Sequence, residues 1–190
     1  MSQANEVKVW SLPVRVFHWL LVTSFFISYF TEEDLLTPHV WAGYLVGMLV
    51  LARIAMGFAG SGHTLFSDFV TSPARAFSYA KQTLAGQAQR YLGHNPAGGL
   101  MIVVLIVCLI LVILSGLVVY GAGEEHAGPL AGMLAGTSKA VAKVYEEIHE
   151  FIANFTLFLV IVHIGGVIVE SKIHKENLAR SMVTGYKRSR

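Results

Sequence analysis

Long apolar stretches and short polar connections alternate along the chain. Four stretches, at about residues 12–30, 39–59, 100–120 and 151–169, approach or exceed the 20 or so apolar residues that cross a bilayer. The third stretch contains no charged residue. The pattern predicts an all-α integral membrane protein in which four helices run up, down, up and down as one bundle.

The connections carry weaker signals. Within the polar segment 60–99, an Ala-rich piece at 72–93 predicts a helix at the membrane surface. Asn95 and Pro96 suit the cap and first turn of the third long helix. Residues 138–150 predict a short helix that can continue into the fourth stretch.

The composition supports a membrane protein. Of the 190 residues, 54% are hydrophobic and only 14% are charged, against about 25% charged in soluble domains. So few charges do not cover the surface of a soluble domain of this size. An intrinsically disordered chain is excluded too, because disorder requires low hydrophobicity and high charge. A single cysteine, Cys108, excludes an internal disulfide. The length suits one domain over residues 1–190.

The charges are sorted by sign between the two sides of the predicted bundle. With both termini on one side, that side holds twelve of the 14 lysines and arginines: Lys8, Arg15, Arg53, Arg75, Lys81, Arg90, Lys172, Lys175, Arg180, Lys187, Arg188 and Arg190. The opposite side holds Lys139 and Lys143 together with eight of the 12 acidic residues: Glu32, Glu33, Asp34, Glu124, Glu125, Glu146, Glu147 and Glu150. The positive-inside rule therefore places both termini and the long middle loop in the cytoplasm.

Four of the eight histidines lie in or at the edge of a predicted span, where ionisable residues are costly and are candidates for function. His149 and His163 are 14 residues apart, which is about 21 Å of helix and about 40° from full register, so they share a face of the fourth helix. The helix directions then pair His18 with His163 near the cytoplasmic side and His39 with His149 near the outer side.

Two histidines that face each other between helices suit the axial ligation of a haem iron. Ligation on both sides leaves no open position on the iron, which favours electron transfer over oxygen binding. The sequence contains no C-x-x-C-H motif, so a haem here is held non-covalently and is of the b type.

Small and basic residues near these histidines extend the haem hypothesis. Glycines that let a flat ring approach the backbone are Gly43, Gly47, Gly116, Gly165 and Gly166. Arg15 and Arg53 are candidates to bind haem propionates. Close helix packing is the alternative role for the glycines, and anchoring at the membrane surface is the alternative for the arginines.

Other interpretations of the four histidines remain. Each can serve as a hydrogen-bonding group between helices. A zinc site needs three or four ligands at one point, which the two separate levels exclude. A proton relay would use carboxylates between the two histidine pairs, and the spans contain none there. For His63, His94, His126 and His174 we expect solvated positions, although any of them can serve a quinone or a partner.

Several segments resemble the bacterial cytochrome b561 family, and in particular its branch that includes the b-type cytochrome subunits of nickel-iron hydrogenases. The segments are VWSLPVRVFHWLL at 9–21, HVWAGY at 39–44, RYLGHNPAGG at 90–99, HEFIAN and HIGG at 149–154 and 163–166, and HKENLARSMVTG at 174–185. The resemblance covers nearly the whole chain. It implies two b haems, with His18, His39, His149 and His163 as the ligands.

The resemblance also implies a place and partners. Members lie in the bacterial cytoplasmic (inner) membrane and pass electrons between quinone or quinol and a partner protein. We expect a periplasmic c-type cytochrome or another redox protein as this partner, the lipid bilayer as the surroundings, and no nucleic acid.

Three functions follow from these expectations. The first is a di-haem electron carrier between the quinone pool and a redox partner. The alternatives are a superoxide:quinone oxidoreductase, which is an enzyme on the same scaffold, and a membrane anchor of a hydrogenase or dehydrogenase, whose hydrogenase-type members usually carry a further helix. A non-redox membrane adaptor is the remaining hypothesis, and it predicts a colourless protein.

Overall fold

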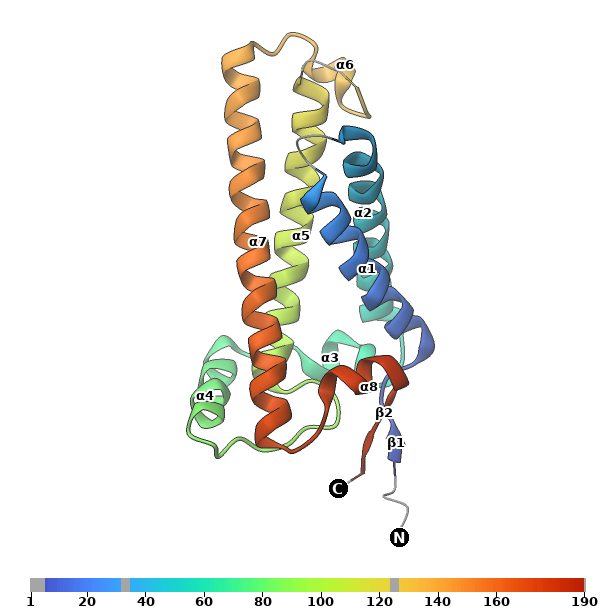
Figure 1. The fold of residues 1–190 in the computed structure, drawn as a ribbon, viewed down its shortest axis with the longest axis vertical. Helices are drawn as coiled ribbons and strands as arrows, with labels where there is room; N and C mark the ends of the chain where they lie inside the picture. The colour runs from blue at the N-terminus through green and yellow to red at the C-terminus, as the bar shows by residue number, and fades with distance from the viewer. Residues whose placement is uncertain (1–5, 32–34, 124–126, 190) are drawn as a thin grey trace. The chain divides into compact units, whose positions relative to one another are not determined.

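The computed structural model describes residues 6–31, 35–123 and 127–189. Each predicted apolar stretch forms one long helix: α1 at Leu12–Phe30, α2 at Leu36–Ala59, α5 at Pro96–Ala122 and α7 at Lys139–Ile173 (Figure 1). All four are long and apolar enough to cross a membrane. The prediction of four spanning helices is therefore confirmed.

Helix α7 is longer than the sequence pattern alone indicates. Its 35 residues correspond to about 52 Å, well beyond the roughly 30 Å hydrocarbon thickness of a bilayer. The predicted short helix at 138–150 is continuous with the fourth apolar stretch. His149 therefore lies about three turns inside a helix, rather than just before one.

Shorter helices occupy the connections. They are the 3₁₀ turn η1 at Gly62–Thr64, α3 at Phe66–Phe69, α4 at Pro73–Leu84, α6 at Ala131–Leu134 and α8 at Leu178–Thr184. The start of α5 has the predicted cap, because the Asn95 side chain accepts a hydrogen bond from the Gly98 amide at 2.7 Å.

Two short strands join the ends of the chain. β1 at Glu6–Lys8 pairs antiparallel with β2 at Tyr186–Arg188, with Val7 opposite Lys187. The sequence analysis predicts no strand, since three residues are too few to show a two-residue period. This two-stranded ribbon of β1 and β2 brings residues 6–8 and 186–188 side by side (Figure 1). An even number of spanning helices places both ends of a chain on the same side of a membrane.

The chain forms two compact units, and each contains one piece of every long helix. The terminal unit comprises Met1–Leu20, Leu51–Val104 and Val160–Arg190, and the internal unit comprises Leu21–Val50 and Leu105–Leu159. His18 and His163 belong to the terminal unit, whereas His39 and His149 belong to the internal unit. Each unit therefore contains one of the two predicted histidine pairs.

The two units differ in what they bury. Buried residues of the internal unit are apolar or small: Ser24, Phe25, Ala42, Val46, Leu49, Val50, Cys108, Leu109, Ala122, Ala153 and Thr156. The terminal unit also buries charged side chains, namely Arg53, Glu170, Glu176 and Lys187. Large apolar side chains such as Met48, Phe58 and Phe158 are more than half exposed, as expected for surfaces that face lipid.

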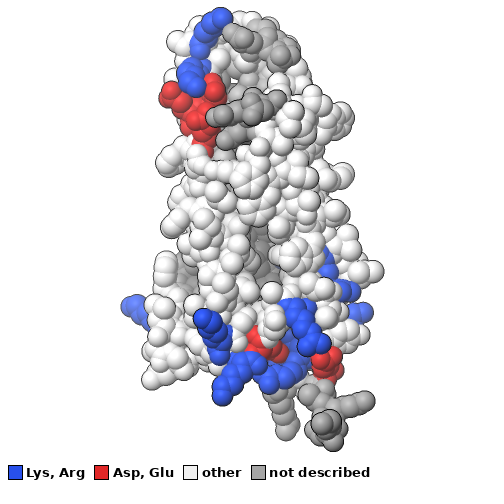
Figure 2. All heavy atoms as spheres, viewed as in Figure 1, with Lys and Arg blue, Asp and Glu red and all other residues white. Residues whose placement is uncertain are grey.

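Charged side chains on the surface follow the predicted sorting. Lysines and arginines gather over the terminal unit, and acidic side chains gather over the first turns of α7 in the internal unit (Figure 2). Part of the predicted pattern lies outside the described residues: Glu32, Glu33, Asp34, Glu124, Glu125, His126 and Arg190.

Candidate functional site

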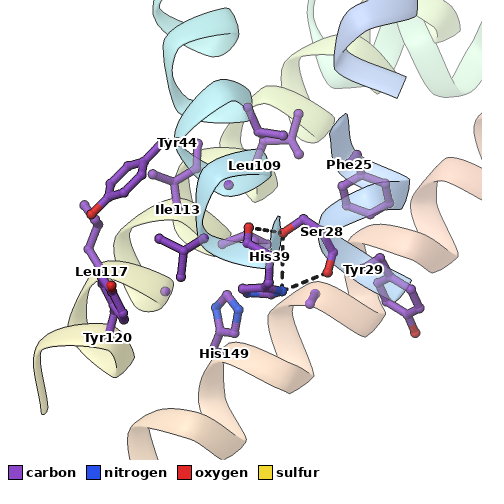
Figure 3. Close-up of a pocket in the computed structure, with 16 residues that line it drawn as sticks. Phe25, Ser28, Tyr29, His39, Tyr44, Leu109, Ile113, Leu117, Tyr120 and His149 are labelled. Carbon is purple, nitrogen blue, oxygen red and sulfur yellow. Dashed lines mark hydrogen bonds between the residues drawn. The ribbon is translucent and has the colours of Figure 1, made fainter. Parts of the chain in front are cut away.

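A pocket lies in the internal unit, where side chains of α1, α2, α5 and α7 converge (Figure 3). Apolar residues such as Phe25 and Leu109 make up most of its lining. His39, from the first turn of α2, and His149, from α7, both line it. The pocket therefore brings together a histidine pair that the sequence analysis matched only by depth.

The two rings lie at a spacing that suits one metal atom. Their centroids are 6.2 Å apart and their planes meet at 80°. Two metal–imidazole bonds of about 2 Å, with about 1 Å from each nitrogen to its ring centre, give about 6 Å. No cluster of three or more metal-binding side chains occurs among the described residues. The pair therefore fits an iron held from two sides better than a zinc site.

The hydrogen bond of His39 determines which ring nitrogen is free. Its Nδ1 lies 2.8 Å from the backbone carbonyl oxygen of Ser28, and a carbonyl only accepts. Nδ1 therefore carries the proton and donates it. The lone pair of His39 is then on Nε2, which is the atom available to a metal.

His149 reaches the same state through a hydroxyl group. Its Nδ1 lies 2.9 Å from Ser115 Oγ, and the Ser115 hydroxyl donates its own proton to the Val112 carbonyl at 3.1 Å. With its proton on Val112, Oγ accepts from Nδ1–H, and this assignment of the tautomer leaves the Nε2 lone pair of His149 free. Sequence analysis did not identify Ser28 or Ser115, although a serine in the charge-free α5 was a usable signal.

One of the predicted glycines allows this arrangement directly. A Cβ atom added at Gly116 would lie 3.1 Å from Cε1 of His149, so this position must be small for the ring to pack against α5. Gly43 and Gly116 both line the pocket. Gly47 faces Ile113, while Cβ atoms at Gly165 and Gly166 would meet nothing within 4 Å.

The second predicted pair lies in the terminal unit. His18 on α1 and His163 on α7 are close enough to interact electrostatically. The Trp19 ring packs edge-on against the His18 ring at 5.2 Å. His18 Nδ1 is buried without a hydrogen-bond partner in the described part of the chain. His18 therefore lacks, among the described residues, an oxygen partner of the kind that orients His39 and His149.

Both predicted arginines belong to the same unit as His18 and His163. Arg15 Nη1 donates to the Val183 carbonyl, and Arg15 Nε is buried without a partner. Arg53 is only 7% exposed. Its Nη1 donates to the Thr64 carbonyl at 3.2 Å.

The Arg53 guanidinium also packs over aromatic rings. It lies 5.0 Å from the centre of the Phe66 ring and 5.5 Å from that of Phe69. The interaction of a cation with these ring faces is favourable and partly offsets the cost of burial. Arg53 is thus held inside the terminal unit, which does not fit a side chain that extends to the membrane surface.

His94 was expected at the surface, and this prediction is wrong. Its ring lies between those of Trp10 and Phe69, with both centroids at 4.7 Å. Burial lowers the pKa of His94 to about 3, helped by the positive charges of Arg53 and Lys187. His94 is therefore neutral, and its buried Nδ1 has no partner among the described residues.

Lys187 is a buried charge that the sequence analysis did not single out. It is 6% exposed because the two-residue period of β2 turns it inward, while Tyr186 and Arg188 point outward. Its ammonium lies 5.8 Å from the centre of the Trp10 ring. Burial lowers the pKa of Lys187, although Glu176 opposes this effect.

The two other described histidines differ in exposure. The His63 side chain is 34% exposed and its Nδ1 lies 2.8 Å from Asp68, in agreement with a solvated position. The His174 side chain is only 12% exposed and lies 3.1 Å from the Glu170 carboxylate, so the prediction of a solvated His174 is wrong.

Glu170 lies in a polar cluster with Tyr79 and Thr83. The Thr83 hydroxyl donates to its carboxylate at 2.8 Å, and the Tyr79 hydroxyl shares its proton between the Gln89 carbonyl at 2.8 Å and Glu170 at 3.2 Å. Burial and the nearby Glu170 raise the pKa of Tyr79, so its hydroxyl keeps the proton that it donates. The cluster joins α4 to the end of α7 within the terminal unit.

Comparison with known proteins gives a family match that covers most of the chain. A sequence model described as prokaryotic cytochrome b561 matches residues 9–185. The chain is also 28% identical to a probable Ni/Fe-hydrogenase B-type cytochrome subunit of Cupriavidus necator, over 94% of this chain and 86% of that protein. No solved structure gives a significant match.

The family implies a b-type haem as the cofactor, and the free Nε2 atoms of His39 and His149 are suitable ligands. Four apolar helices of spanning length agree with a multi-pass protein of the bacterial inner membrane. The family match covers most of the chain, and we conclude that this protein belongs to the prokaryotic cytochrome b561 family of membrane electron-transfer proteins.

Proposed function

We propose that the protein is a di-haem cytochrome that carries electrons between a redox partner and the quinone pool. His39 and His149 would ligate one haem in the internal unit, and His18 and His163 would ligate the other in the terminal unit. One domain over residues 1–190 would then contain two cofactors, with α7 supplying one ligand to each.

The observation that carries this proposal is the geometry of His39 and His149. Their rings are 6.2 Å apart in an apolar pocket, and both Nδ1 atoms donate hydrogen bonds. A pair of histidines that merely joined two helices would bond to each other or to the opposite helix through the nitrogens that face the gap. Here those nitrogens carry lone pairs, which suits a metal between them.

When bound, a haem iron supplies a one-electron redox centre, and the protein residues tune it. The apolar lining of the pocket excludes water and lowers the local dielectric. Ser28 and Ser115 orient the imidazoles. Arg15 and Arg53 would neutralise haem propionates in the terminal unit, and the unpartnered Nε of Arg15 supports this role.

The similar hydrogenase-type cytochrome suggests the partner. That protein is described as a probable Ni/Fe-hydrogenase subunit, so we infer that a hydrogenase-type enzyme exchanges electrons with this chain. The quinone pool of the inner membrane would be the other reaction partner. The sorting of charge supports cytoplasmic termini, since basic residues gather in the unit that carries both termini.

The test is the haem content of the purified protein. We expect two b haems per chain in the wild type and one in each of His149→Ala and His163→Ala, by reduced-minus-oxidised spectra and total haem. His63→Ala is the matched control, since His63 is paired with Asp68, and it should keep both haems. A colourless wild type, or full haem content in both variants, would exclude the proposed sites.

The partner is tested in membranes. Co-expression with a Ni/Fe hydrogenase should allow hydrogen to reduce the haems and then quinone, and His149→Ala should block this transfer. Reduction by a superoxide flux in the absence of a hydrogenase would instead favour the oxidoreductase alternative.

A further inference from the structure

Three cations of the terminal unit have no carboxylate partner among the described residues, and two of them, Arg53 and Lys187, are buried while Arg15 is half-buried. Arg15, Arg53 and Lys187 form no ion pair with any residue in the described ranges. Burial of an uncompensated charge is unfavourable, and proteins usually pair such groups. The unit therefore presents more positive charge than its own acidic residues neutralise.

Lys187 has the weakest compensation of the three. The guanidinium groups of Arg15 and Arg53 each donate to a backbone carbonyl, whereas the ammonium of Lys187 has, within the described part of the chain, only the ring of Trp10 at 5.8 Å. The nearby Glu176 carboxylate is already occupied. It accepts from Arg90 at 2.9 and 3.3 Å and from the Arg188 amide at 3.0 Å.

Two aromatic side chains, Trp10 and His94, connect Lys187 with the surroundings of His163. Trp10 lies between Lys187 and His94, with its ring 5.8 Å from the ammonium and 4.7 Å from the His94 ring. His94 is in turn close enough to interact electrostatically with both Lys187 and His163. The buried Nδ1 of His94 and Nε of Arg15 lack partners as well. Unpartnered basic nitrogens thus gather beside the second histidine pair.

We propose that Lys187 binds a carboxylate of the haem that His18 and His163 hold, and that it raises the reduction potential of that haem. The inference rests on the proposed haem site in the terminal unit. A porphyrin carboxylate is an anion that would remove the charge imbalance. A cation beside the haem also favours the reduced iron, because reduction adds a negative charge.

The terminal ribbon positions this lysine. The pairing of β1 with β2 sets the inward direction of Lys187, and the bonds of Glu176 to Arg90 and Arg188 attach β2 to the rest of the unit. Glu176 is therefore a positioning residue, since it acts through Lys187. In this arrangement the two chain ends together complete a cofactor site.

The experiment is a redox titration of both haems in the intact, detergent-purified protein. In Lys187→Gln we expect one of the two midpoint potentials to fall and the other to stay constant. Lys187→Arg keeps the charge and should restore most of the shift. Lys172→Gln removes an exposed charge from the end of α7 and should shift neither potential.

A double variant assigns the effect to one haem. In His163→Ala, where only the internal haem is expected, the further change Lys187→Gln should leave the remaining potential unchanged. Loss of the terminal haem in Lys187→Gln also supports the proposal if Lys187→Arg restores it, and contradicts it if Lys187→Arg does not.

Unchanged potentials with two haems bound in Lys187→Gln would overturn the proposal. An equal shift in Lys172→Gln would overturn it too. Neither result affects the proposed haem ligation, which fails if the wild type lacks the haems or if His149→Ala and His163→Ala both keep the full haem content.

Discussion

The internal and terminal units present the same ligand type in opposite surroundings. In the internal unit, His39 and His149 line an apolar pocket, and both Nδ1 atoms donate to neutral serine oxygens. In the terminal unit, His18 Nδ1 has no partner among the described residues, and Arg53 and Lys187 are buried in the same unit.

The difference shows two ways to tune one cofactor. Neutral hydrogen bonds orient the ligands of the internal unit, whereas buried positive charge acts in the terminal unit. Because nearby cations favour the reduced haem, we expect the terminal haem to have the higher reduction potential. Electrons would then pass from the internal to the terminal haem.

The largest expected effect concerns the space beside His149. In Gly116→Val, the added side chain would overlap the imidazole, since the Cβ position alone is 3.1 Å from Cε1. We expect loss of the internal haem, which is half of the total, while the terminal haem keeps its spectrum. Gly132→Val is the control, because a Cβ there meets nothing within 4 Å. Loss of both haems would show that the units do not bind haem independently.

A smaller effect is expected from the hydroxyl that orients His149. Ser115→Ala removes the acceptor of Nδ1–H, and loss of such a partner typically weakens metal affinity by about 10–100-fold. Haem transfer to an apoprotein acceptor should be faster for the internal haem only, and Ser115→Thr should restore retention. Ser24→Ala is a control on α1 of the same unit. Equal release rates in Ser115→Ala and wild type would contradict the role of this hydrogen bond.

In the terminal unit, the corresponding test removes a charge. Burial opposes ionisation of Glu176, but the bonds from Arg90 and the Arg188 amide lower its pKa, so it is ionised at neutral pH. Glu176→Gln should destabilise the protein by on the order of 1–2 kcal/mol through the weakened ribbon. Thermal unfolding should show the lower stability. Redox titration should show a change in the terminal haem and none in the internal haem. Glu6→Gln, at the exposed start of β1, should have no effect.

The smallest effect is a dependence of stability on pH. The pKa of His94 is about 3 in the folded protein and 6.5 in the unfolded chain, so the unfolded chain binds more protons between these values. The contribution of His94 is complete above pH 6.5 and is lost as the pH falls toward 3. Thermal midpoints at pH 7.5 and pH 5 should differ less in His94→Phe than in the wild type. An identical difference in both proteins would exclude His94 as the source.

The predicted helices follow directly from the sequence. Four apolar stretches of about 20 residues form helices in lipid, because every backbone group must then find its hydrogen-bond partner within its own helix. The four histidines stand out for a similar reason, since an ionisable ring in an apolar span is costly and therefore a candidate for function. Depth along the helices then sufficed to pair His18 with His163 and His39 with His149, and the structure places each pair in one unit.

The sequence did not reveal Ser28, Ser115, His94 and Lys187. The tautomers of His39 and His149 depend on oxygens brought to them from other helices, Ser28 from α1 and Ser115 from α5, far along the chain from His149. His94 is buried by Trp10 and Phe69, which precede it by 84 and 25 residues. Such contacts have no periodic signature along the chain.

The length of an apolar stretch is a property of a single helix in lipid, and the sequence by itself therefore determined the number of spans. Charge sorting and helix geometry predicted the direction of each span and the level of each histidine. The tertiary structure alone decided which ring nitrogens are free and which cations are buried. Both depend on the pairing of distant segments, as in the ribbon of β1 and β2 that turns Lys187 inward.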